Sequence, residues 1–302
     1  GDGNIDVNPM FVDTANGNYN LLASSQLINA GHPDSLDSDG TVADIGAYPY
    51  LNSYSGPTWY ITEAGNDTTA TGSSDDPFRS IQSGINFSSD ADSVTVAAGT
   101  YVENINFRGR NIKVVGEDRE TTIIDGNNSR NIVRIEQSSN ILFKSFTIMN
   151  SYGWPEVEGE SSAGGGIIIN GNGPKVIDNM IFSNNYAAHG GAIQINGHDV
   201  TIKNSVFKNN GSAWGGSGIT IGGHRSLIEN CLFYDNYGGQ SVIAYGVSED
   251  LSIINHSTIV DNDAGGIDFS YHNSSYLISH SFLAGNTGNW NAELMNFDAS
   301  TP

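Results

Sequence analysis

The sequence predicts an all-β solenoid, in which short strands stack coil upon coil along one axis. Two observations predict it: one motif recurs about every 25 residues, and apolar residues alternate with small ones in short segments that glycine and asparagine interrupt. The composition agrees, because 37 of the 302 residues are glycine and only 15% are charged. A chain with few charges suits stacked turns better than amphipathic helices, which need a charged face.

The recurring motif ends in asparagine in each of its five clear copies. The copies are KVIDNMIFSNN (175–185), VTIKNSVFKNN (200–210), SLIENCLFYDN (226–236), SIINHSTIVDN (252–262) and YLISHSFLAGN (276–286). An earlier copy, ILFKSFTIMN, ends at Asn150, before an insertion around SYGWPEVEGESSAG. Strands this short bury an apolar face only if each coil lies on the next, about 4.8 Å away, with like residues over like.

A glycine-rich ladder precedes these copies and forms the first strand ladder of the coils. Its segments are GGIIING, GGAIQING, SGITIGG, SVIAYG and GGIDFSY, whose alternation predicts an inward column of Ile167, Ile193, Ile219, Ile243 and Ile267. The motif predicts two more columns, Phe182, Phe207 and Phe233 in one and Ser205, Cys231, Ser257 and Ser281 in the other. Cys231, the only cysteine, is therefore interpreted as a small core residue rather than a nucleophile, and it excludes an internal disulfide.

The position six residues before each final asparagine also aligns. It is occupied by Asn179, Asn204, Asn230, His256 and His280. Asparagine adopts left-handed turn geometry readily, and its amide can bond to the copies above and below. We interpret this column as a structural ladder that two histidines continue.

The N-terminal part of the predicted solenoid carries a family resemblance. The segment WYITEAGNDTTATGSSDDPFRSIQSGINFSSDADSVTVAAGTYVENINF (59–107) resembles the start of right-handed parallel β-helices of the pectate-lyase-like superfamily in secreted bacterial proteins. The resemblance covers about residues 58–286 and includes NIKVVGEDRETTIIDG (111–126) as the next coil. It implies an all-β, right-handed parallel β-helix, closed at its start by a short N-terminal capping helix at about residues 77–87.

The first 50 residues resemble the C-terminal closing region of the same class of proteins. The resemblance rests on NIDVNPMFVDTANGNYNLLASSQLINAGHPDSLDSDGTVADIGAY (4–48). We therefore expect residues 1–50 to be the closing segment of a preceding or neighbouring unit, 51–57 to be a linker, and 58–302 to be the β-helix. This hypothesis predicts head-to-tail contact between copies, because an uncapped solenoid end exposes strand edges. The alternative is an arbitrary fragment of a two-domain protein.

An acidic turn in the N-terminal segment predicts a calcium site. Asp34, Asp37, Asp39 and Asp44 surround Gly40 in HPDSLDSDGTVADIGAY. Calcium takes six to eight oxygen ligands, which aspartates at alternate positions around a glycine turn can supply. A solvated acidic turn is the alternative.

Candidate catalytic residues are sparse on the face where the resemblance implies that substrate would lie. Alternation places Ile168, Gln194, Thr220, Ala244 and Asp268 outward on the first strand ladder. We find no lysine or arginine on this ladder to act as a lyase base, and Asp268 stands without the second carboxylate that an inverting hydrolase uses. The best acid and base candidates lie on one turn edge: His198, Asp199, His224 and Arg225. Exposed turn residues in register are the alternative.

Aromatic side chains in the loops that lead into this ladder suggest a sugar-binding platform. The candidate ligand-binding residues are Trp154, Tyr186, His189, Trp214 and Tyr237, with Gln194 and Asp268 on the ladder itself. Aromatic rings stack on apolar faces of ligands, and Trp214 and Tyr186 are the predicted stacking residues. Ordinary loop packing is the alternative.

Composition limits the possible partners. The chain carries 33 acidic and 12 basic residues, for a net charge of −21, which repels nucleic acid and anionic membranes. We expect a non-catalytic, secreted or cell-surface protein that is structural, adhesive or carbohydrate-binding, with copies of itself and a polysaccharide as partners. The alternative is a polysaccharide lyase or glycoside hydrolase that acts in the groove of the first strand ladder.

Overall fold

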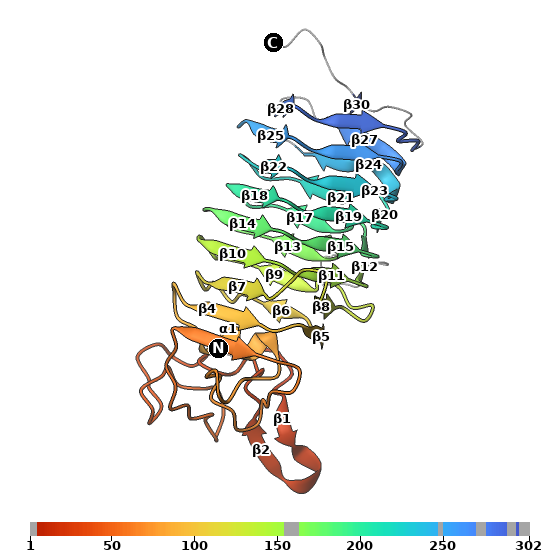
Figure 1. Cartoon of the computed structure of the whole chain (residues 1–302). Coiled ribbons are helices and arrows are strands. Elements are labelled where there is room, and N and C mark those ends of the chain that lie inside the picture. The colour runs from red at the N-terminus through yellow and green to blue at the C-terminus, as the bar shows by residue number, and fades with distance from the viewer. Residues whose placement is uncertain (1–4, 154–162, 247–249, 270–275, 289–293, 296–302) are drawn as a thin grey trace.

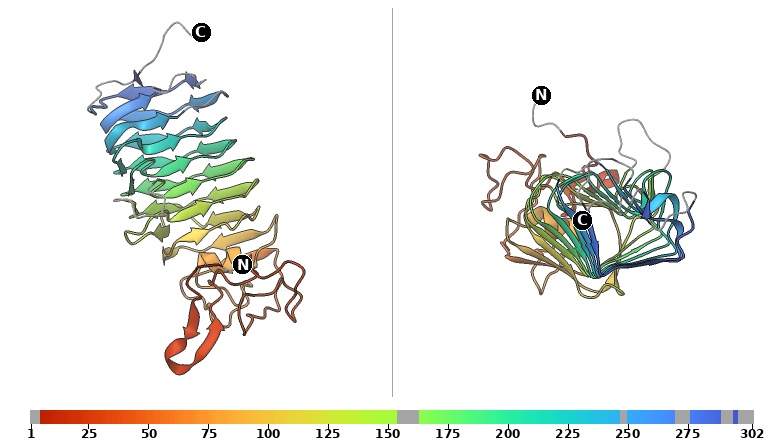
Figure 2. Two further views of the ribbon diagram at one scale, coloured as in Figure 1. Left: turned by 180° about the vertical axis from the view of Figure 1, so that it is seen from behind. Right: turned by 90° about the horizontal axis from the view of Figure 1, so that it is seen from above.

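The computed structural model describes residues 5–153, 163–246, 250–269, 276–288 and 294–295. Three sheets of parallel strands wrap a shared core and stack along one axis, as Figures 1 and 2 show. The prediction of a right-handed parallel β-helix with one short N-terminal helix is confirmed. Each coil contributes one strand to each sheet over most of the rod, so that strands far apart in the sequence become neighbours.

The nine strands of the first sheet, here sheet I, are β3 (Thr58–Ile61), β4 (Ser93–Val96), β7 (Lys113–Gly116), β10 (Ile141–Lys144), β14 (Lys175–Asp178), β18 (Val200–Lys203), β22 (Leu227–Glu229), β25 (Ser252–Asn255) and β28 (Tyr276–Ser279). Sheet II has eight: β5 (Gly99–Val102), β8 (Thr122–Asp125), β11 (Thr147–Met149), β15 (Ile181–Ser183), β19 (Val206–Lys208), β23 (Leu232–Tyr234), β26 (Thr258–Val260) and β29 (Phe282–Ala284).

Sheet III has eleven strands and contains the predicted glycine-rich ladder. They are β6 (Ile105–Asn106), β9 (Val133–Ile135), β12 (Tyr152–Gly153), β13 (Ile167–Ile169), β16 (Tyr186–Ala187), β17 (Ile193–Ile195), β20 (Gly211–Ser212), β21 (Gly216–Ile221), β24 (Tyr237–Tyr245), β27 (Asp263–Asp268) and β30 (Leu294–Met295).

The predicted columns are confirmed in register. Ile167 pairs with Ile193, Ile193 with Ile219, Ile219 with Ile243 and Ile243 with Ile267, and all five are fully buried. The rings of Phe182, Phe207 and Phe233 stack with centroid distances of 4.8 and 4.4 Å and interplanar angles of 12° and 9°. Such near-parallel stacks follow from the repeat, because equivalent phenylalanines in successive coils have the same surroundings.

Cys231 substitutes for serine in a buried hydrogen-bonded column, as predicted. The amide of Met180 donates to Ser205 Oγ, the amide of Cys231 to Ser257 Oγ, and the amide of Ser257 to Ser281 Oγ, at 3.1–3.3 Å. Burial raises the pKa of the Cys231 thiol to about 12. A thiol that stays protonated is a poor nucleophile, which agrees with the interpretation of Cys231 as a core residue.

The final asparagines of the motif form a second buried column, which joins successive coils. Its members are Asn185, Asn210, Asn236, Asn262 and Asn286. At each step from one coil to the next, the Oδ1 atom accepts from both the backbone amide and the Nδ2 atom of the preceding asparagine, at 2.7–3.3 Å. The Nδ2 atoms also donate to backbone carbonyls, such as that of Phe207 for Asn236. This buried asparagine ladder satisfies turn groups that no strand can pair.

The turn column predicted from Asn179 to His280 adopts left-handed geometry at all five positions, with φ between 49° and 56°. His256 and His280 stack with their ring centroids 4.8 Å apart and an interplanar angle of 7°. The residue before each ladder asparagine is left-handed too, as at Asn184, Asn209 and Asp235. The predicted continuation of the column by the two histidines is therefore confirmed.

The N-terminal end of the β-helix is closed by the helix α1 (Ile81–Phe87). Its first amides, those of Ile81 and Gln82, donate to the carboxylate of Glu103, the last residue of the segment VTVAAGTYVE. Burial raises the pKa of Glu103 to about 7, although these two hydrogen bonds act to lower it.

Residues 5–50 pack against this closed end of their own chain. They contain β1 (Phe11–Asp13), the short 3-10 helix η1 (Thr14–Asn16) and β2 (Asn18–Leu21), which protrude as a hairpin in Figure 1. Asn86 of α1 donates to the carbonyls of Ala23 and Ser25, and Arg108 donates to that of Ile28. The segment thus has a partner in its own chain, whereas its role in closing a neighbouring unit stays a prediction.

We predict that Asn236→Ala lowers the free energy of unfolding by about 4 kcal/mol. The substitution leaves the amide of Asn210 and the carbonyl of Phe207 buried without this partner, and each such group costs roughly 1–3 kcal/mol. The matched control is Asn196→Ala, because Asn196 is exposed and its amide bonds to Asn170 on the outside of the coil. Denaturant unfolding of both variants checks the prediction, and equal losses would contradict it.

Candidate functional site

The outward column of the first strand ladder lies in the predicted register, and four of its five members are buried, whereas Thr220 is half-buried. Ile168 pairs with Gln194, and the column continues through Thr220 and Ala244 to Asp268. Gln194 is 7% exposed and Asp268 is 2% exposed. These positions therefore do not form the open floor of a groove.

An arginine missed by the sequence reasoning stands on this column. Arg134 of β9 pairs with Ile168, so the expectation that the ladder carries no basic residue was wrong. Its coil, NNSRNIVRIEQSSN, has no glycine, whereas each of the five later segments of the ladder has at least one, so the glycine pattern does not identify it.

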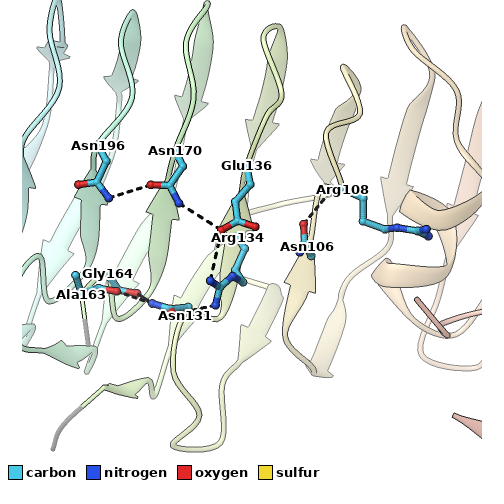
Figure 3. A network of polar contacts seen from close by, with 9 residues as sticks. All are labelled: Asn106, Arg108, Asn131, Arg134, Glu136, Ala163, Gly164, Asn170 and Asn196. Atoms are coloured by element: carbon cyan, nitrogen blue, oxygen red, sulfur yellow. Dashed lines mark hydrogen bonds and ion pairs between the residues drawn. The ribbon is translucent and has the colours of Figure 1, made fainter. Parts of the chain in front are cut away.

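Arg134 belongs to a ladder of polar side chains on the outside of sheet III, shown in Figure 3. Its guanidinium lies 3.4 Å from Glu136 Oε1 and donates to Asn131 Oδ1. From Glu136 the contacts run up the rod, because Asn170 donates to Glu136 Oε1 and Asn196 donates to Asn170 Oδ1. The guanidinium is thus paired with Glu136 and Asn131, and the Arg134 side chain is 41% exposed.

The four catalytic candidates come together on one turn edge, as predicted, but they pair differently from an acid–base relay. Arg225 binds both carboxylate oxygens of Asp199, at 2.6 and 2.9 Å, and also Asp250, at 2.6 Å. His198 Nδ1 accepts from the backbone amide of His224, and the two rings lie 4.5 Å apart. Burial, together with the charges of His224 and Arg225, lowers the pKa of His198. Hydrogen bonding to Arg225 holds the pKa of Asp199 below its usual value.

These contacts indicate that the turn edge has a structural role. Asp199 has both oxygens on Arg225 and none on His198, so it does not orient the imidazole as a triad carboxylate does. Protonation of His198 at Nδ1 would remove the acceptor that the His224 amide uses. The geometry therefore favours the alternative of exposed turn residues in register.

Two of the predicted aromatic residues, Tyr186 and Tyr237, form a row with Tyr152 along the edge of sheet III, and their rings stack on one another. Tyr152 stacks on Tyr186, with centroids 5.5 Å apart, and Tyr186 stacks on Tyr237 at 6.3 Å. Gly211 lies between the last two, and a Cβ atom there would lie 2.5 Å from the Tyr237 ring. Stacked rings present edges rather than faces to a sugar, so this row resembles the packing alternative.

Two of the remaining aromatic candidates lie on adjacent coils, because the amide of Trp214 donates to the carbonyl of Ala188, the residue before His189. Trp214 is 59% exposed on the side of the rod, and His189 is exposed beside Gly215. Trp154 lies outside the described residues. The role of Trp214 in stacking on a glycan stays a prediction.

The aspartates of the predicted calcium site hold their own loop. Asp44 accepts from the amides of Asn29 and Tyr50, at 2.7 Å each, and Asp39 accepts from Thr41 and from the amide of Asn52. Asp37 accepts from the amide of Asp44. Among the described residues, no three His, Cys, Asp or Glu side chains are grouped so that they would hold a metal ion. The calcium prediction gains no support from this geometry.

We predict that Asp44→Ala lowers the free energy of unfolding by about 2 kcal/mol, because hydrogen bonds to a charged acceptor are worth about 1.5–3 kcal/mol. Asp34→Ala is the control, since that side chain is 91% exposed. Thermal unfolding with EDTA and with excess calcium should give the same midpoint for the parent protein. Loss of stability with EDTA, restored by calcium, would contradict this interpretation and support the calcium site.

The chain matches two family models and several solved structures. Residues 127–290, more than half of the chain, match the model described as right handed beta helix region. Residues 63–108 match a model described as a protein of unknown function, DUF1565. No protein with a curated description matches.

Two solved pectin methylesterases are similar in structure. The enzyme from Aspergillus niger is 12% identical, with a TM-score of 0.49 over 83% of this chain and 94% of its own. The enzyme from carrot is 12% identical, with a TM-score of 0.38 over 82% and 88%. At such identity and TM-scores, neither bears on the activity of this chain.

The family match agrees with the coils and columns described above. No helix in the described ranges is long and apolar enough to span a membrane. On the strength of the match over residues 127–290, this chain belongs to the right-handed β-helix family.

Proposed function

We propose that this chain is a non-catalytic, extracellular structural or adhesive β-helix, and that copies join head to tail into a linear array. The observation that carries the proposal is where large apolar side chains are exposed. Of the thirteen such residues in the described part of the chain, six lie in residues 5–51 and two, Leu277 and Phe282, lie on the last coil. These two groups stand at opposite ends of the rod.

The C-terminal end also carries strand edges. Sheet I ends at β28 and sheet II ends at β29, with no further strand beside either among the described residues. Ile278 and Leu283 on these strands are partly buried against the core. Such an end, with strand edges and a partly covered core, is a template for association with another chain.

The sides of the rod support a non-catalytic role. Asp199 and Arg225 pair with each other, His198 accepts from the next coil, and four of the five outward residues of the first strand ladder are buried. An enzyme needs such groups aimed at a shared space beside the substrate. A contact between unlike ends need not close, so it produces a linear array rather than a ring.

We predict that the parent chain forms linear particles as its concentration rises, and that Leu36→Lys and Leu277→Lys each keep it monomeric. Leu36 is 63% exposed in the N-terminal segment and Leu277 is 48% exposed on the last coil, so neither substitution disturbs the core. Trp214→Lys, on the side of the rod, is the matched control and should assemble like the parent. Sedimentation velocity and electron microscopy measure the outcome.

A parent chain that stays monomeric, or a control that assembles as poorly as the end variants, would contradict the array. The same preparation is incubated with neutral and acidic polysaccharides, including methyl-esterified pectin. New reducing ends, unsaturated products or released methanol would contradict the non-catalytic role.

A further inference from the structure

A groove of about 470 Å³ runs along the turns that join sheet I to sheet II. It crosses successive coils, because its lining includes the turn residues Asn179, Asn204, Asn230 and His256. Four coils span about 14 Å at the usual strand spacing of about 4.8 Å. The groove lies on a different side of the coil from the glycine-rich ladder, and no expectation from the sequence pointed to it.

The walls of the groove offer both hydrogen-bond donors and acceptors at each coil. Asn204 donates to Asp178 Oδ1 and Asn230 donates to Asn204 Oδ1, at 2.7 and 2.8 Å. Each of these amide groups has a second N–H, and both side chains are exposed. His256 continues the row with an imidazole ring.

An apolar strip lies beside this polar row. Val206 and Leu232 start the strands β19 and β23, point away from the core, and are half-buried in the lining of the groove. A polar row next to aliphatic side chains matches a ligand that has both hydroxyl groups and C–H faces.

A side chain of the protein itself, Arg119, already donates a hydrogen bond into this groove. Arg119 comes from the loop after β7, three strands before β18 in sheet I, and its Nη1 atom donates to the carbonyl of Asn204 at 3.0 Å. A turn carbonyl in the groove therefore takes a donor from a side chain that lies along the rod. The carbonyls of Asn230 and His256 occupy the same place in the next two coils.

The charged side chains in and beside the groove limit which class of ligand can bind there. Arg119 is the only formally charged residue in the lining, and Glu120 lies 3.4 Å from its guanidinium. A cationic ligand would meet Arg119, while an anionic ligand would find that cation already paired. Hydroxyl groups both donate and accept, so they fit amides and carbonyls that alternate along the groove.

We infer that this groove binds a neutral oligosaccharide, which lies along the axis of the rod across the turns from Asn204 to His256. The inference goes beyond the proposed assembly, because the groove lies on the side of the β-helix and uses neither end. It assigns the adhesive surface to the corner between sheets I and II rather than to the first strand ladder.

The test is an NMR titration of the whole chain, with side-chain amides and backbone amides observed together. The probes are cellohexaose, mannohexaose and xylohexaose, with hexagalacturonate and hexalysine for the charged classes. At least one neutral hexasaccharide should shift the side-chain amide signals of Asn204 and Asn230 and saturate them.

Two leucines of one coil provide a matched pair of variants. Leu232→Asp places a carboxylate in the groove and should weaken binding at least tenfold. Leu227→Asp changes a half-buried leucine on the same coil that lies in sheet I, outside the lining, and should bind like the parent. Asn230→Asp, which keeps a residue that tolerates the left-handed turn, is the second groove variant should Leu232→Asp fail to fold.

The inference is overturned if no neutral hexasaccharide shifts the groove amides, if only a charged probe does, or if the groove and control variants bind alike. Shifts confined to sheet III would overturn it as well and would favour the first strand ladder. Leu277→Lys should remain monomeric and still bind the sugar, so failure of the array and failure of the groove are separate results.

Discussion

The buried asparagine ladder is the constraint on which the rest of this β-helix depends. A parallel coil must turn between sheets, and each turn brings backbone groups into the interior where no strand can pair them. Asn185, Asn210, Asn236 and Asn262 meet this need with one residue per coil, since the same side chain bonds to its neighbour coil and to nearby carbonyls. The ladder forms only when successive coils are in vertical register, so it fixes the register of the coils between Asn185 and Asn286.

That register explains why histidine, arginine and tyrosine side chains on the rod already contact side chains of the adjacent coils. Once coils repeat, a histidine meets the histidine above it, an arginine meets the aspartates of the adjacent coils, and a tyrosine meets a tyrosine. Polar groups are then used in rows along the rod instead of in clusters around one point. A surface of this kind is suited to long ligands and to other copies of itself, which is why the proposals above concern a groove along the axis and the two ends.

The sequence predicted the columns well, because in a repeat the repeat length alone determines which residues of successive coils align. It predicted the isoleucine and phenylalanine columns, the serine column with Cys231, and the left-handed turns. It missed Arg134 because that coil departs from the glycine pattern. It also placed Gln194 and Asp268 on an open face, whereas both are buried, since alternation gives the direction of a side chain but not what covers it. The spacing of the aspartates around Gly40 did not predict that nearby amides donate to their carboxylates, and the calcium site itself stays a prediction.

Native-state hydrogen exchange tests most directly whether the fold depends on the asparagine ladder, because the ladder asparagines should then be the most protected turn residues. The backbone amides of Asn185, Asn210, Asn236 and Asn262 donate to buried Oδ1 atoms. They should therefore exchange as slowly as the core strand amides, near the rate set by global opening. Exchange of these four amides at the rate of the exposed loop at residues 34–40 would contradict the account.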